Sequence, residues 1–286
     1  MAAFFLIRLG DKRDRMYINI GTIMIPVYGL LIVTGAMIGF GAGIYIIKRN
    51  CLSVDEFIIL VGYTCAGGFI GAKLLYLWVS RDDIQWNRLL EYEYFRQIMN
   101  GGFVFYGGLA GGFIALWCAH KIHHILAVKY LSVCIPVLPL VHGFGRIGCG
   151  LVGCCYGIPY DGMFAIKYHE SAGAPLNISL FPIQYLEAGI NFLIALILFC
   201  VVLKQGINIC NIYLYVAIYS VMRFLLEFFR YDRNERGFWL GISTSQWISI
   251  ALFLSVGLVW VLHLKRVRLR REKEIQNPTR TKSSSF

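Results

Sequence analysis

Residues 27–47 read VYGLLIVTGAMIGFGAGIYII, a run without a single charged side chain, and the basic pair Lys48-Arg49 follows it directly. About 20 apolar residues in a helix, at 1.5 Å per residue, cross the roughly 30 Å hydrocarbon core of a bilayer. This stretch therefore predicts a membrane-spanning helix, which we place at about residues 20–47.

The rest of the chain has the same apolar character. Of its 286 residues, 58% are hydrophobic and 15% are charged, and the mean hydropathy is +0.63. Soluble domains carry about 25% charged residues, so the composition excludes an ordinary soluble enzyme, a disordered protein and a secreted disulfide scaffold. We expect an all-α integral membrane protein with seven transmembrane helices, at about residues 20–47, 56–80, 102–120, 131–153, 182–204, 209–230 and 244–264.

The distribution of charge predicts the orientation. Residues 265–286 carry eight Lys or Arg and two Glu. A basic run directly after a span is typical of a cytoplasmic anchor facing anionic lipid, and we prefer this interpretation to a nucleic-acid site. Seven spans then place the N-terminus outside and the C-terminus in the cytoplasm. We expect one transmembrane domain over residues 1–264 and a basic, disordered tail over 265–286. On the outer side we expect an interfacial helix within 81–101 and an ordered loop over 154–181.

Glycines recur at intervals of four residues within several spans. Such small-xxx-small faces let helices approach closely in lipid. The pattern predicts a tightly packed bundle, with these faces: Gly35, Gly39 and Gly43 in the first span, Gly67 and Gly71 in the second, Gly107 and Gly111 in the third.

Ionisable side chains inside a span are costly and therefore indicate function. The spans contain Lys73, His142, Arg146, Glu187, Arg223 and Glu227. In the predicted orientation four of these groups lie in the outer half of the bilayer, together with Tyr28 and Tyr106: Lys73, Arg146, Glu187 and Arg223. Several helices thus contribute polar groups at one depth, which predicts a site that opens towards the outer leaflet.

The sixth span gives the clearest local pattern. Tyr219, Arg223, Glu227 and Arg230 follow one another at spacings of 4, 4 and 3, so they share one helix face, and Glu227 can orient Arg223. Arginines are always charged and bind phosphate with two parallel hydrogen bonds. We expect Arg146 and Arg223 to hold a phospholipid headgroup. A lipid-binding protein and an enzyme that displaces a phosphate-bearing leaving group would both need them.

Three other motifs have simpler interpretations. Gly143-Phe-Gly-Arg-Ile-Gly148 matches a dinucleotide-binding pattern, but it lies inside an apolar span with no preceding strand. Cys149, Cys154 and Cys155, with His142, could bind a metal, although their spacing is not one of the usual zinc patterns; we expect neither a metal nor a cofactor. Ser243-Thr-Ser-Gln246 predicts a capping box that opens the last span.

Taken together, these residues resemble the prolipoprotein diacylglyceryl transferase family of bacterial membrane enzymes, over nearly the whole chain. The most specific motifs are Gly143-Phe-Gly-Arg146-Ile-Gly148 followed by Gly157, and Tyr219-x3-Arg223-Phe-x2-Glu227-Phe-Phe-Arg230. Supporting matches are Gly101-Gly-Phe-Val-Phe-Tyr106, Gly71-Ala-Lys73-x2-Tyr76, Phe181-Pro-Ile-Gln184 with Glu187, and Ser245-Gln246.

The resemblance implies a seven-span transferase of the bacterial cytoplasmic (plasma) membrane that uses no metal or cofactor. It would transfer the diacylglyceryl group of phosphatidylglycerol to the lipobox cysteine thiol of a prolipoprotein and release glycerol phosphate. The expected partners are phosphatidylglycerol, lipobox peptides and membrane lipid, with no nucleic acid. Arg146 and Arg223 would hold the phosphate. The expected substrate-binding residues are Tyr28, Lys73, Gly157, Glu187, Tyr219, Glu227 and Arg230.

The chain departs from the family pattern at two positions. Tyr106 stands where many members carry His, and Cys149 where many carry Asn. Tyrosine is a poor general base because its pKa lies near 10. We hypothesise that His142, one turn before Arg146, accepts the proton, with Tyr106 kept as a second expected catalytic residue; the alternative for His142 is a packing role.

These departures leave a second function open, a divergent member with the same lipid-binding fold but another acceptor or no activity. A third alternative is an unrelated receptor or transporter. A retinal receptor would need a lysine in the last span, and residues 244–264 contain none. A transporter built from inverted repeats would show two matching halves, which we do not find in the sequence.

Overall fold

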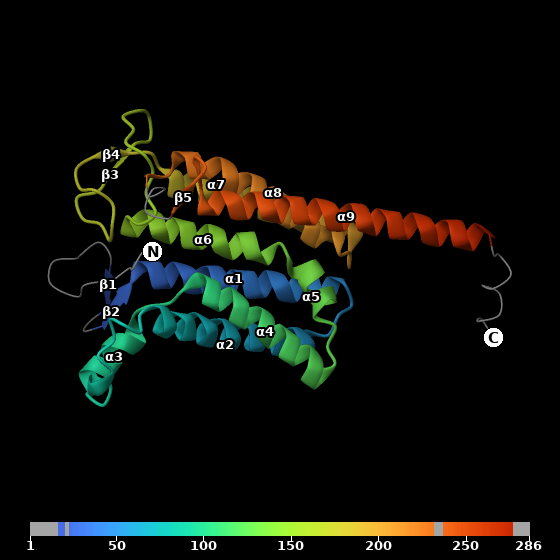
Figure 1. Ribbon diagram of the computed structural model, residues 1–286, viewed down its shortest axis with the longest axis horizontal. Coiled ribbons are helices and arrows are strands. Elements are labelled where there is room, and N and C mark those ends of the chain that lie inside the picture. Colours follow the sequence, from blue (N-terminus) through green and yellow to red (C-terminus); the bar gives the residue numbers. More distant parts are fainter. Residues whose placement is uncertain (1–16, 21–22, 232–236, 277–286) are drawn as a thin grey trace.

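The computed structural model describes residues 17–20, 23–231 and 237–276 as a bundle of helices with short hairpins at one end (Figure 1). The helices are α1 (Val27–Arg49), α2 (Val54–Val79), α3 (Tyr92–Asn100), α4 (Phe105–His123), α5 (Ala127–Cys134), α6 (Val137–Val152), α7 (Ile183–Gln205), α8 (Cys210–Leu226) and α9 (Thr244–Gln276), with 3-10 turns η1 (Trp86–Arg88) and η2 (Glu227–Phe229).

Three two-stranded antiparallel hairpins lie together with α3 at one end of the bundle, here called the hairpin end (Figure 1). They pair β1 (Tyr17–Ile20) with β2 (Ile23–Pro26), β3 (Ile166–Lys167) with β4 (Ser179–Leu180), and β5 (Phe238–Trp239) with β6 (Ile242–Ser243). The hairpin β3–β4 lies within residues 154–181, where the sequence predicts an ordered loop, and α3 lies within residues 81–101, where it predicts an interfacial helix.

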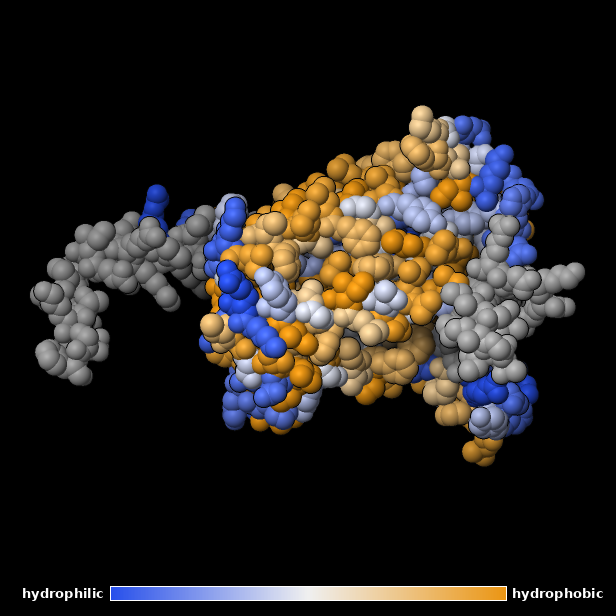
Figure 2. All heavy atoms as spheres, turned by 180° about the vertical axis from the view of Figure 1, so that it is seen from behind, coloured by the Kyte–Doolittle hydropathy of each residue, from blue (hydrophilic) through white to orange (hydrophobic). Residues whose placement is uncertain are grey.

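The helices are those of a membrane protein. Five of the described helices are long and apolar enough to cross a bilayer: α1, α2, α7, the segment Cys210–Phe229, and the segment Thr244–Leu262 of α9. The helices α5 and α6 are bent by 55° at their break, and they add a sixth span if they cross the bilayer together. Figure 2 shows the corresponding hydrophobic band between two hydrophilic ends. The fold is thus helical with five or six candidate spans. The remaining predicted span, α4, fails this test because four glycines and a polar last turn lower its hydropathy.

The element boundaries differ from the predicted ones in three places. The first helix starts at Val27 because Pro26 precedes it as the N-cap and the hairpin β1–β2 comes before. The predicted span 131–153 is broken before α6, at Pro136, because proline lacks an N–H and clashes with the preceding turn.

The third difference concerns the basic tail. The helix α9 continues to Gln276, so the prediction of a disordered tail is wrong for residues 265–276. Arg, Lys, Leu and Glu, which dominate this stretch, are strong helix formers and extend the helix beyond the apolar span. Residues 277–286 lie outside the described part of the chain.

The glycine faces pack as predicted. The helices α2 and α4 cross so closely that a Cβ on Gly71 would collide with the Gly107 carbonyl oxygen, and one on Gly111 with the Gly67 oxygen. In α1, a Cβ on Gly39 would lie 2.7 Å from the Val141 side chain of α6. These contacts fix neighbouring helices against each other, and α6, α7, α8 and α9 then meet at the hairpin end (Figure 1).

Candidate active site

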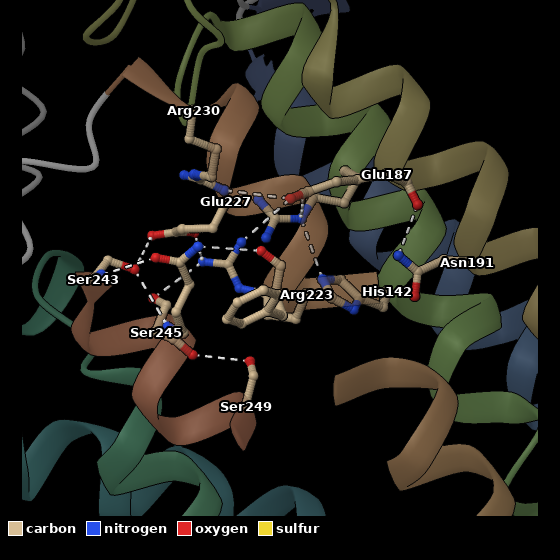
Figure 3. A network of polar contacts seen from close by, with 12 residues as sticks. His142, Glu187, Asn191, Arg223, Glu227, Arg230, Ser243, Ser245 and Ser249 are labelled. Carbon is tan, nitrogen blue, oxygen red and sulfur yellow. Dashed lines mark hydrogen bonds and ion pairs between the residues drawn. The ribbon is translucent and has the colours of Figure 1, made fainter. Parts of the chain in front are cut away.

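One carboxylate joins three arginines at the hairpin end of the bundle (Figure 3). Glu187 lies in the second turn of α7. Its Oε2 is 2.6 Å from Arg146 Nε of α6, and its Oε1 is 3.5 Å from Arg223 Nη1 of α8 and 3.6 Å from Arg230 Nη1. The two arginines expected to hold a phosphate are therefore neighbours, linked by a single side chain.

A second carboxylate completes this network. Glu227 Oε2 is 2.8 Å from Arg223 Nη2, one helical turn earlier. This confirms the predicted contact between Glu227 and Arg223. Ser243 Oγ donates a hydrogen bond of 3.0 Å to Glu227 Oε1, and Arg223 Nη2 donates one of 3.3 Å to Ser245 Oγ. The start of α9 thus holds both members of the Arg223–Glu227 pair (Figure 3).

The predicted capping box is confirmed at the same place. The Ser243 N–H donates to Gln246 Oε1 over 2.9 Å, and the Gln246 N–H donates to Ser243 Oγ over 3.3 Å. Sequence reasoning gave Ser243 a structural role only and missed its contact with Glu227. The two residues are 16 positions apart and belong to different elements, so helix periodicity gives no signal for that contact.

Among the residues that the structure describes, the network joins three guanidinium groups to two carboxylates. The side chains of Glu187, Glu227 and Arg230 are at most 3% exposed, whereas those of Arg146 and Arg223 are 14% and 12% exposed. The accessible edge of the network therefore belongs to these two arginines. In surroundings of low dielectric constant, a partly accessible pair of guanidinium groups favours a bound anion.

His142 and Tyr219 border the network. Arg146 Nε donates a hydrogen bond of 3.2 Å to His142 Nε2, so this nitrogen acts as an acceptor, as in a neutral ring. The His142 and Tyr219 rings lie 6.0 Å apart, centroid to centroid. His142 thus contacts Arg146, and the Tyr219 ring lies beside the His142 ring.

Tyr28 and Gly157 contact backbone segments that carry residues of the network. The Tyr28 ring packs against Gly148 of α6, where a Cβ would be 2.8 Å from the ring. Gly157 forms an antiparallel bridge with Arg230, and a Cβ on it would collide with the Phe181 carbonyl oxygen. Glycine at 157 therefore permits the close approach that fixes the backbone of Arg230.

The structure does not bring Lys73 or Tyr106 into the network. Lys73 Nζ donates hydrogen bonds to the carbonyl oxygens of Ile98 and Gly101, at the end of α3. It also lies 4.9 Å from the centroid of the Tyr76 ring. Tyr106 is 57% exposed and lines a groove of about 1270 Å³ between α2 and α4.

A group of three thiols adjoins the arginines. Cys149 lies in the last turn of α6, Cys154 and Cys155 follow the helix, and their three Sγ atoms lie within 4.8 Å of one another. The pKa of Cys155 is lowered by hydrogen bonds with Cys149 and Cys154 and, to a lesser extent, by the charges of Arg230 and Arg146. The fold thus brings together three cysteines whose spacing along the chain is not typical of a metal site.

Comparison with known proteins identifies the family. A sequence model of the prolipoprotein diacylglyceryl transferase family matches residues 15–262. The chain belongs to this family. It is 35% identical over 255 residues to the phosphatidylglycerol–prolipoprotein diacylglyceryl transferase of Clostridium tetani, an alignment that covers 86% of this chain and 98% of the relative.

Two further relatives carry the same description. The phosphatidylglycerol–prolipoprotein diacylglyceryl transferase 2 of Clostridium perfringens is 31% identical over 86% of this chain and 96% of its own length. The enzyme of Dehalococcoides mccartyi strain BAV1 is 26% identical over 93% of this chain and 98% of its own length. Membership in the prolipoprotein diacylglyceryl transferase family makes this protein a membrane-embedded transferase, and the matched region contains the whole arginine–glutamate network.

Proposed function

We propose that this protein transfers the diacylglyceryl group of phosphatidylglycerol to the lipobox cysteine thiol of prolipoproteins and releases glycerol phosphate. The observation that carries the proposal is the convergence of Arg146 and Arg223 on Glu187, with an accessible edge formed by these two guanidinium groups. A lipid phosphodiester carries one negative charge and offers oxygens to both guanidinium groups.

The proposed topology has seven spans in the bacterial cytoplasmic membrane, with the N-terminus outside and the C-terminus in the cytoplasm. Two features support it. The helix α4 packs lengthwise against α2 and is counted as the additional span. The last turns of α1, α4 and α7 carry Lys48, Lys121 and Lys204 at the end opposite the hairpins, as the positive-inside rule expects for the cytoplasmic side. The arginine network then faces the outer leaflet.

The chemistry requires charge stabilisation at the leaving group. When the acceptor sulfur attacks the glycerol carbon, the carbon–oxygen bond breaks and its electron pair stays on the departing phosphate, which becomes a dianion. Arg146 and Arg223 stabilise this growing charge. Because Glu187 and Glu227 already hold both guanidinium groups in place, little reorganisation is needed during the reaction.

The direct test is product formation. The full-length protein in phosphatidylglycerol vesicles, given a lipobox peptide, is expected to produce a diacylglyceryl thioether that mass spectrometry detects. Arg146→Ala and Arg223→Ala are each expected to lower the rate by about 100-fold or more. Arg96→Ala, at an exposed arginine of α3, is the matched control and should react normally. Unimpaired turnover in both site variants would refute the role of the network.

The same assay separates the alternative function. The departures at Tyr106 and Cys149 favour testing whether the chain is a divergent member with another acceptor or no activity. That alternative predicts that phosphatidylglycerol binds, with Arg146→Ala weakening the binding, while no peptide adduct forms.

His142 is the proposed proton acceptor for the acceptor thiol. Phosphate binding to Arg146 would free the His142 Nε2 lone pair that now accepts from Arg146 Nε. The variant His142→Ala should lose at least tenfold in turnover at neutral pH, and the loss should shrink as the pH approaches the thiol pKa near 8.5, where solvent ionises the thiol. A variant with unchanged turnover and an unchanged pH profile would leave His142 with a packing role only.

A further inference from the structure

The turn after α6 has an unusual backbone. Gly153 ends the helix in the left-handed conformation, with φ of 73°, and its N–H donates to the Cys149 carbonyl oxygen. Cys155 also has a positive φ, 54°, which residues with a Cβ rarely adopt. Together these two residues fold the chain back, so that Cys154 and Cys155 come to lie against Cys149.

The three thiols are arranged as a set of metal ligands. Their Sγ atoms all lie within 4.8 Å of one another, and Cys149 is buried whereas the other two are partly accessible. Sulfur ligands favour soft cations such as Zn²⁺. Within the described residues, this group contains no fourth His, Cys, Asp or Glu. Zinc sites with four protein ligands are structural, whereas sites with three leave a position open to substrate.

We propose that Cys149, Cys154 and Cys155 bind a thiophilic cation, Zn²⁺, whose open fourth position takes the thiol of the acceptor cysteine. This inference rests on the proposed function, because it assigns the acceptor of that reaction to a place in the structure.

The location suits this role. Cys149 follows Arg146 by three residues and lies on the same side of α6. The turn that carries Cys154 and Cys155 leads directly into Gly157, whose backbone bridges to Arg230. An acceptor sulfur on the metal would therefore lie next to a phosphate held by the arginines. Three thiolates and one Zn²⁺ carry a net charge of −1, and the nearby guanidinium groups of Arg230 and Arg146 favour this negative charge.

The reaction then balances as follows. Metal binding deprotonates the acceptor thiol. Because His142 lies two helical turns before Cys149, the released proton reaches this proposed acceptor through solvent rather than directly. The bound sulfur, with its electron pair, forms a bond to the glycerol carbon, while the carbon–oxygen bond breaks and its electrons leave with the phosphate. The thioether product carries no charge and binds the metal weakly, so it can leave. The metal matters because a free thiol with a pKa near 8.5 is a poor proton donor to an imidazole.

The first test asks whether the metal site exists. The purified full-length protein is stripped with a chelator and titrated with Co²⁺, whose bonds to thiolates give a charge-transfer absorption band. We expect one Co²⁺ per chain, displaced by Zn²⁺. Cys149→Ser, Cys154→Ser and Cys155→Ser should each weaken binding by about tenfold or more. Cys200→Ser, at an exposed cysteine of α7, is the matched control and should bind normally.

The second test asks whether the acceptor binds the metal. Adding a lipobox peptide to the Co²⁺ protein should change the absorption band, and a peptide with Ser in place of Cys should not change it. The metal-free protein in phosphatidylglycerol vesicles should form the thioether at least tenfold more slowly at neutral pH, and Zn²⁺ should restore the rate.

Each opposite result has a defined meaning. If the wild-type protein forms the thioether but shows no stoichiometric Co²⁺ band, or if mass spectrometry finds a disulfide among the three cysteines, the metal site is refuted and the proposed function stands. If the metal-free protein reacts at the full rate, the acceptor role is refuted. If the Co²⁺ band responds to neither peptide and no thioether forms, the proposed function and the acceptor role both fail.

Discussion

Glu187 is the side chain on which the arginine network depends. It contacts guanidinium groups from three separate segments, and it is almost fully buried. Three cations brought this close without a carboxylate would repel one another, and burial removes the water that would screen them. Removing one partner of a buried ion pair costs about 3 to 5 kcal/mol because the remaining charge is left uncompensated.

Glu187→Gln is therefore expected to destabilise the protein strongly. We predict a loss of about 3 kcal/mol or more in the free energy of unfolding, measured by thermal unfolding in detergent with phosphatidylglycerol. Glu91→Gln is the matched control. Its carboxylate pairs with Arg88 at the surface, where ion pairs contribute little, so its melting temperature should stay close to that of the wild type. Equal melting temperatures for the two variants would contradict this account of Glu187.

The sequence predicted contacts between residues one helical turn apart, such as Arg223 with Glu227, because helix periodicity determines them. It placed Glu187 at the correct end of the bundle but could not identify it as the centre of the network, because Arg146 and Arg223 reach it from other helices. Lys73 shows the same limit. Its depth along α2 was predicted, but the direction of its side chain, towards the end of α3, depends on how the helices pack.

At the scale of elements, α2 and α4 form the tightest helix pair through facing glycines. Hydrophobic run length was sufficient to predict most spans, and the glycine spacing predicted this contact. The break at Pro136 was missed because apolar composition alone does not detect a kink. The helical part of the tail was missed because apolar composition does not show where a helix ends when strong helix-forming residues follow the span.

Gly71→Ala is expected to separate these two helices, because its Cβ would overlap the Gly107 carbonyl oxygen. We predict a loss of about 1–3 kcal/mol in stability, as for other overpacked sites, measured as a fall in melting temperature. Gly62→Ala, also in α2, is the control. Nothing lies within 4 Å of its added Cβ, so the higher helix propensity of alanine should leave stability equal or slightly increased. Equal effects at the two positions would argue against close packing of α2 on α4.

At the scale of the whole molecule, the two ends of the bundle should face different compartments. Cys51 is exposed in the turn between α1 and α2, on the side proposed to be cytoplasmic. In a background without other cysteines, a membrane-impermeant maleimide should label Cys51 in inside-out vesicles but not in intact cells. A cysteine introduced by Glu91→Cys, before α3 at the hairpin end, should show the opposite pattern. Labelling of both positions from one side would refute the seven-span topology.

The dependence of Arg146 on Glu187 has a consequence for biogenesis. Glu187 follows Arg146 by 41 residues, so α6 reaches the translocon before the counterion in α7 does. Transfer of an arginine without a partner into the hydrocarbon core has a high free-energy cost. The helix α6 should therefore remain at the protein-conducting channel until α7 enters beside it. Nascent chains cut off before residue 183 should integrate α6 poorly, whereas chains that extend through α7 should integrate both helices together.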